Sequence, residues 1–163
     1  MALEAFVQEY GETLQYVLFF GLLALFGLLE AVAPGWRHPV ERGRRWPPNF
    51  VLTALNILVL GALPVTGIGI AALARERGWG LLNRYPLSPG TVLATAIIAR
   101  SLVSYAVHVA MHKVPVLWRV HRVHHTDTAV DVSTTVRFHP LEFLIQLGPT
   151  ALALLLLGLP PWT

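Results

Sequence analysis

Four of the chain's seven histidines lie within one stretch of fourteen residues, HKVPVLWRVHRVHH, at positions 112–125. A fifth, His108, lies just before this stretch, and a sixth, His139, lies after it. His108 and His112 are separated by four residues, so on a helix their rings lie about 40° apart on one face. Neutral imidazole is a common metal ligand and suits iron, zinc and copper. The pair therefore predicts a metal site near the end of a helix.

A second group follows as H-x-x-H-H, formed by His121, His124 and His125. His121 shares a helix face with each of the other two, whereas His124 and His125 diverge by about 100° and can serve two metals. The chain has no cysteine, which excludes disulfides and thiolate ligands. The zinc-protease motif H-E-x-x-H is also absent. We predict one metal-binding unit. So much imidazole beside apolar segments fits a non-haem iron centre that handles dioxygen, although the spacing alone does not distinguish iron from zinc or copper.

The elements that must position these histidines are strongly apolar. The chain of 163 residues is 55% hydrophobic and 13% charged, against about 25% charged in an ordinary soluble domain. A membrane-spanning helix needs about 20 mainly apolar residues. The candidate segments are residues 14–33, 50–74, 91–112 and 143–159. We predict an all-α integral membrane protein with about four transmembrane or re-entrant helices, in which Pro64 either kinks the second segment or folds it back.

The charged linkers predict the orientation of the chain. Four arginines, Arg37, Arg42, Arg44 and Arg45, lie in the first linker, and the positive-inside rule places that linker in the cytoplasm. Counting spans then places the histidine-rich linker, residues 113–142, in the cytoplasm as well. The N-terminus has no basic residue before the first apolar run, so we expect that run to be a retained anchor rather than a secretory signal. Because the basic residues alternate with apolar segments, we expect no nucleic-acid binding.

Two motifs carry a resemblance to a known family. They are P-V-L-W-R-V-H-R-V-H-H-T-D, residues 115–127, and T-V-R-F-H-P-L-E, residues 135–142. Over residues 101–142 the chain resembles the fatty acid hydroxylase/sterol desaturase superfamily of membrane di-iron oxygenases. The resemblance implies a helical membrane domain with a cytosolic histidine-rich segment, two iron ions, dioxygen and an external electron donor. It also implies a lipid substrate, with hydroxylation or desaturation of a fatty acyl, sterol or related chain.

The same resemblance implies roles for individual residues. The expected iron ligands are His108, His112, His121, His124 and His125, with His139 as a further ligand, a hydrogen-bond donor behind a ligand, or a loop anchor. Asp127, Asp131 and Glu142 are expected to accept N–H bonds from the ligating imidazoles. Helix capping is an equal alternative for Asp127 and Asp131. His38, isolated in the first linker, is not expected to bind metal.

Three features depart from the family pattern. Ser101 stands where the family usually has Asp, and Val109 where it usually has Arg. A third histidine box, expected further toward the C-terminus, is absent from the 163 residues. We therefore expect residues 1–163 to be a single membrane domain of this family, truncated at its C-terminus, which alone holds fewer than two irons and turns over poorly. The alternatives are a non-catalytic truncated family member and a membrane metal-binding protein.

Overall fold

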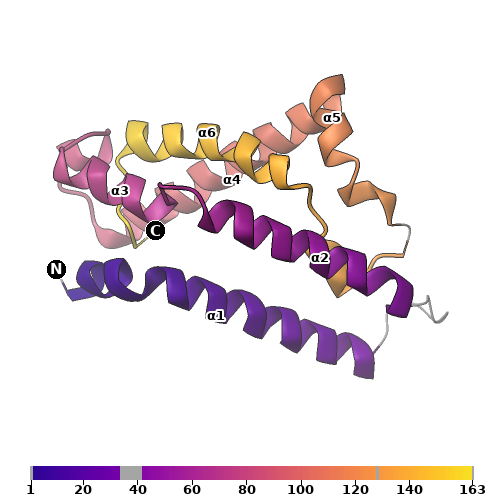
Figure 1. Ribbon diagram of the computed structural model, residues 1–163. Helices are drawn as coiled ribbons and strands as arrows, with labels where there is room; N and C mark the ends of the chain where they lie inside the picture. The colour runs from indigo at the N-terminus through magenta and orange to yellow at the C-terminus, as the bar shows by residue number, and fades with distance from the viewer. Residues whose placement is uncertain (1, 34–41, 128, 163) are drawn as a thin grey trace. The chain divides into compact units, whose positions relative to one another are not determined.

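The computed structural model describes residues 2–33, 42–127 and 129–162, and every regular element in these ranges is helical (Figure 1). The α-helices are α1 (Ala2–Val32), α2 (Arg42–Gly61), α3 (Gly67–Glu76), α4 (Pro89–Lys113), α5 (Pro115–His121) and α6 (Pro140–Leu157). Short 3₁₀ turns lie between them: η1 (Leu82–Arg84), η2 (His124–Thr126) and η3 (Val132–Val136). The prediction of an all-α fold is confirmed.

Three of the described helices are long and apolar enough to cross a membrane. These candidate spans are Glu9–Val32 in α1, Pro89–Lys113 in α4 and Pro140–Leu157 in α6. At most 11% of the most apolar part of each is buried inside the protein, so their apolar side chains face outward. Outward-facing apolar helices of this length are suited to lipid rather than water. The prediction of an integral membrane protein is confirmed, and the candidate span α6 continues without a break through Pro149, a residue that membrane helices tolerate.

The second apolar segment is divided as Pro64 predicts. Helix α2 ends at Gly61, and α3 begins at Gly67 after a turn that contains Pro64. The side chain of Thr66 accepts a hydrogen bond from the backbone N–H of Gly69 and so caps the new helix. Proline has no N–H to donate and clashes with the preceding helical turn, which explains the break.

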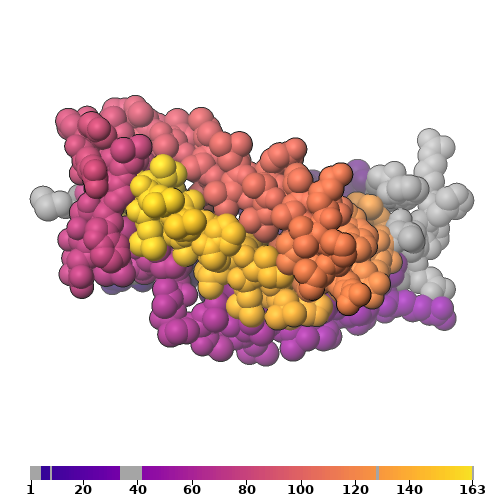
Figure 2. Space-filling model, turned by 90° about the horizontal axis from the view of Figure 1, so that it is seen from above, coloured from indigo at the N-terminus to yellow at the C-terminus, as the bar shows by residue number. Residues whose placement is uncertain are grey.

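The described residues form two compact units. The first contains those of residues 1–13, 63–110 and 144–163, and the second those of 14–62 and 111–143. In the first unit a small core joins α3, α4 and α6 through Ala71, Ala96 and Leu154. Figure 2 shows the C-terminal part of the chain, in yellow, lying against the region of α3, in magenta. A Cβ atom at Gly80, whose φ is 94°, would overlap the backbone of Gly158, so a glycine is required at this crossing.

The second unit holds most of the histidines. Val114 adopts an extended conformation before Pro115, which ends α4 and starts α5. The chain then passes through η2 and η3 before it enters α6 at Pro140. Helix α2 packs against η3, and the contacts between them are largely polar. The histidine-rich segment is thus held by a helix that precedes it by about 80 residues in the chain.

Candidate metal centre

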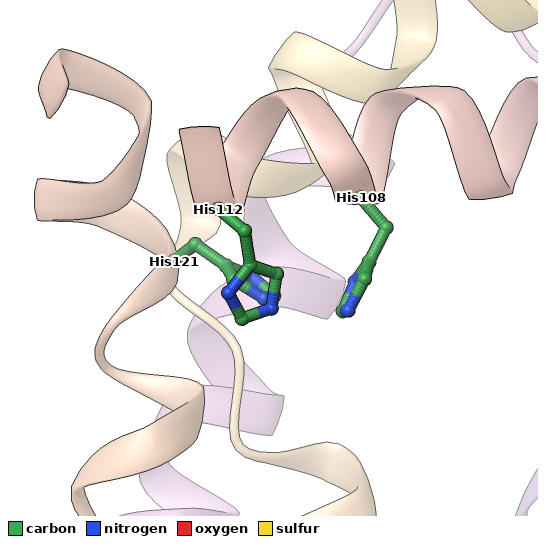
Figure 3. A group of neighbouring side chains, drawn as sticks. All are labelled: His108, His112 and His121. Atoms are coloured by element: carbon green, nitrogen blue, oxygen red, sulfur yellow. The ribbon is translucent and has the colours of Figure 1, made fainter. Parts of the chain in front are cut away.

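Three histidines from two consecutive helices converge. Helix α4 is unbroken from Pro89 to Lys113, so His108 and His112 project from the same side of it, one turn apart (Figure 3). The third, His121, is the last residue of α5. One ring nitrogen from each of the three lies within 4.8 Å of the others. The structure therefore joins one histidine of the second group to both histidines of the first, as a common site requires.

His121 is the most enclosed member of this group. Its side chain is fully buried, and its Nδ1 lies 2.9 Å from Oε1 of Glu142, which is 6% exposed. An ionised carboxylate can only accept, so with Glu142 charged the proton of His121 is on Nδ1 and its lone pair is on Nε2. This arrangement is typical of metal-binding histidines, whose second nitrogen donates to a carboxylate or carbonyl group. The structure thus shows a contact between Glu142 and one of the histidines that we predict to bind metal.

His125 and His124 extend the cluster from η2. Nε2 of His125 lies 3.2 Å from Nε2 of His121, and the His125 ring centroid lies 4.9 Å from that of His112. His124 stacks on Phe138 with ring centroids 4.7 Å apart, and its Nδ1 lies 3.3 Å from the carbonyl oxygen of Arg137. A carbonyl also only accepts, so the lone pair of His124 is likewise on Nε2. In His121 and His124 the lone pair of Nε2 is therefore available to a metal, because Nδ1 of each ring is bonded to a different partner.

His139 has a different position. It directly precedes α6, and its Nδ1 accepts a hydrogen bond of 3.1 Å from the backbone N–H of Leu141. An accepting Nδ1 places the proton of a neutral ring on Nε2, so neither nitrogen offers a lone pair to a metal in this arrangement. Of the three roles considered from the sequence, the geometry fits the loop anchor, acting as a helix cap. His38 lies outside the described residues.

Asp127 and Asp131 are bound by Arg45 of α2. Arg45 donates to both carboxylates, with N–O distances of 2.8 Å to each, and also to the carbonyl oxygen of Ala129. Asp131 additionally caps η3 through a reciprocal pair of bonds with the turn. Burial opposes ionisation of both carboxyl groups, but hydrogen bonds, including those from Arg45, outweigh it and leave the pKa of each below its usual value. The structure therefore shows the capping alternative for Asp131 and an ion pair for Asp127.

Helix α2 contributes a polar face that the sequence reading had not assigned to the site. Asn49, Thr53 and Asn56 are buried, and they bond to Ser133 and to the carbonyl oxygens of Val136 and Phe138. With Arg45 they follow a spacing of four, four and three residues, which is one face of a helix. This helical spacing of polar residues, in or beside an apolar segment, is the pattern in the sequence that could have identified the polar face of α2.

The donor set fits a metal ion that prefers nitrogen. Metal–imidazole bonds are about 2.0–2.1 Å long, so two ligand nitrogens lie about 3.3 Å apart around a tetrahedral ion. The Nε2 atoms of His121 and His125, 3.2 Å apart, already have this separation. Oε2 of Glu142 is buried and has no hydrogen-bond partner among the described residues. An acceptor of this kind is costly unless a cation, water or proton satisfies it. The residues therefore fit a bound metal.

A groove lies along the same face of α4, between α4 and α6. Its volume is about 630 Å³, within the usual range for small-molecule sites of about 300–1,000 Å³. On α4 it is lined by Ser101, Ser104, Tyr105 and His108, which succeed one another at helical spacing. Thr150 is among the residues that line it from α6. The groove therefore includes one of the converging histidines.

Residues 93–163 match the family model for fatty acid hydroxylase. The matched range contains α5, α6, nearly all of α4 and the six histidines from His108 to His139. No curated protein and no solved structure matches the chain. The resemblance to this lipid-acting family is therefore confirmed over the part of the chain that carries the histidine cluster.

Proposed function

We propose that the protein is a membrane-bound non-haem iron oxidoreductase that uses dioxygen to hydroxylate or desaturate a lipid chain. One observation carries the proposal: His108, His112 and His121 converge within the segment that matches the fatty acid hydroxylase family. The match gives the class of reaction, and the convergence supplies a place for the metal that this reaction needs.

The residues that would hold iron are His108, His112, His121, His124 and His125. Iron bound by these imidazoles would supply the redox chemistry that activates dioxygen. The tautomers of His121 and His124 are set by Glu142 and by the Arg137 carbonyl, so each presents Nε2 without a prior proton transfer. Imidazole ligands without cysteine suit iron. The number of iron ions, two in the family, is an expectation from the resemblance.

The protein's own contribution is to position the lipid beside the metal ligands. The groove that begins along Ser101 and includes His108 is the proposed entry for the lipid chain, because it lies between two candidate membrane spans. Trp118 packs its ring against those of His112 and His125, with centroids 5.3 and 5.6 Å away. The Trp118 ring therefore lies beside two of the proposed ligands.

The contacts of the second unit also support a cytoplasmic histidine segment. Arg45, at the start of α2, bonds to Asp127 and Asp131 in the histidine-rich linker. The start of α2 and the histidine-rich linker must therefore lie on the same side of the membrane. If the second apolar segment folded back, α4 alone would cross between the first linker and the histidine-rich linker, and these two linkers would lie on opposite sides of the membrane. We therefore infer that this segment crosses the membrane and that electrons come from a cytoplasmic donor.

The proposal is tested by supplying ¹⁸O₂, ferrous iron and a reductant to the purified chain with lipid. Hydroxylation puts one oxygen atom into a C–H bond and releases the other as water, with two electrons and two protons from the donor. Desaturation removes two hydrogens and releases both oxygen atoms as water. We expect iron-dependent formation of one of these products at a low rate in the wild-type chain, because it lacks the third histidine box, and no product in His121→Ala. Bound iron with no oxidised lipid would support the alternative of a metal-binding, non-catalytic protein.

A further inference from the structure

Arg137 forms hydrogen bonds to both ends of the turn that carries His124 and His125. Nε of Arg137 donates to the carbonyl oxygen of Val123, directly before the two histidines, at 2.9 Å. One terminal nitrogen, NH2, donates to the hydroxyl of Thr126, directly after them, at 2.7 Å. A single planar guanidinium thus fixes the two ends of a turn of two ligand residues.

The guanidinium is itself anchored to α2. Its other terminal nitrogen, NH1, donates to Oδ1 of Asn49 at 2.5 Å. Asn49 is fully buried and is held in turn by a 2.8 Å bond from its amide to Oγ of Ser133. The amide of Asn49 therefore has its oxygen directed at Arg137 and its nitrogen at the segment that precedes Arg137. The turn is tied through Arg137 to a helix more than 70 residues earlier in the chain.

The backbone at the same position orients His124. The carbonyl oxygen of Arg137 lies 3.3 Å from Nδ1 of His124, and the next residue, Phe138, stacks on the His124 ring at an interplanar angle of 3°. Carbonyl and ring together fix the tautomer and the plane of this imidazole. Displacing residues 137 and 138 would release both constraints at once.

We propose that Arg137 and Asn49 form a positioning pair that holds the His124–His125 turn in the geometry for metal binding. The inference rests on the proposed metal site but concerns residues outside its ligand set. Lysine at position 137 keeps the charge but loses the planar fork, so it cannot bond to Val123, Thr126 and Asn49 with the same geometry. Loss of groups that orient metal ligands typically lowers metal affinity by about 10- to 100-fold.

The test is Co²⁺ binding to the purified full chain in detergent, followed by the visible absorption of the bound ion and by equilibrium dialysis. Arg137→Lys should weaken Co²⁺ binding by about 10-fold or more and shift the absorption bands, because ligand geometry changes. Arg119→Lys, an exposed arginine of α5, is the matched control and should change neither. Wild-type affinity and an unchanged spectrum in Arg137→Lys would overturn the proposal.

A second pair of variants decides the matter if Arg137→Lys fails to fold. Thr126 is exposed, so replacing it should preserve the fold. Thr126→Val removes the acceptor for Arg137 and should weaken Co²⁺ binding, whereas Thr126→Ser retains the hydroxyl and should restore it. Equal Co²⁺ affinity in the two variants would contradict the proposal.

His124→Ala separates this inference from the proposed function. If His124→Ala weakens Co²⁺ binding but Arg137→Lys and Thr126→Val do not, only the positioning role fails. If His124→Ala binds Co²⁺ as the wild type does, His124 is not a ligand and both proposals fail at this residue.

Discussion

Oε1 of Glu142 lies 2.9 Å from Nδ1 of His121, and both side chains are buried at the start of α6 and the end of α5. The contact fixes which nitrogen of His121 faces the converging histidines. Removing it should therefore affect metal affinity more than it affects the helices themselves.

We predict that Glu142→Gln lowers metal affinity by about 10-fold and Glu142→Ala by up to about 100-fold. The amide of Gln still accepts from Nδ1 but carries no negative charge, so it supports the imidazole less strongly. Metal titration of the purified variants measures the effect. Glu12→Gln, at an exposed site on α1, is the control and should bind as the wild type does. Wild-type affinity in Glu142→Ala would show that the carboxylate is not needed to orient His121.

Arg45→Met should destabilise the protein strongly. The Arg45 side chain is 16% exposed, and its partners Asp127 and Asp131 are 6% and 5% exposed. Removing one member of a buried ion pair leaves uncompensated charge and typically costs about 3–5 kcal/mol of unfolding free energy. Chemical denaturation in detergent measures this change. Arg42→Met removes a 41% exposed arginine that lies 3.5 Å from Glu30, and its effect should stay within about 1 kcal/mol. Equal effects of the two substitutions would contradict the buried-pair account.

His139 offers a test of capping against metal binding. His139→Ala should lower the unfolding free energy by about 0.5–2 kcal/mol, the usual effect of losing an N-cap. His139→Asn should keep both stability and iron, because asparagine is among the preferred N-cap residues. Iron content and unfolding are measured on the same preparations. If His139→Asn lost as much iron as His121→Ala, His139 would be a ligand after all.

The bond between Arg45 and Asp127 also predicts the labelling of single cysteines. The chain has no cysteine of its own, and Gly43, Lys113 and Thr135 are exposed. Gly43→Cys, Lys113→Cys and Thr135→Cys should all react with a membrane-impermeant thiol reagent only when it has access to the cytoplasm. Labelling of Gly43→Cys and Thr135→Cys from opposite sides would rule out the contact in the membrane, and labelling of all three from outside would reverse the orientation.

Much of the fold could be predicted because lipid imposes simple rules on sequence. Long apolar runs predicted α1, α4 and α6, and Pro64 predicted the break between α2 and α3. The beginning of α2 was missed: the helix extends back to Arg42, through Pro47 and Pro48, into a linker that charge alone had defined. Hydropathy detects the part of a helix in lipid and says little about where the helix starts outside it.

Part of the site could be predicted from local patterns in the sequence. Helical spacing placed His108 beside His112. The resemblance of residues 135–142 to the family motif led us to expect Glu142 as a hydrogen-bond acceptor for an imidazole. The partners of Asp127 and Asp131 depend on tertiary contacts with Arg45, some 80 residues away, which no local pattern encodes. For His139 three roles stayed open, although a histidine before Pro140, with Glu142 in the first turn that follows, is also the pattern of a helix start.

The most direct test of the central claim is the iron content of the purified chain after anaerobic loading with Fe²⁺ and removal of free metal. Each iron needs about three protein ligands and an open position, so five imidazoles should hold clearly fewer than two irons per chain. His121→Ala should lose most of the bound iron, and His38→Ala should retain it. Equal loss in the two variants, or a wild-type chain that binds no iron, would contradict the assignment of these histidines as an iron site.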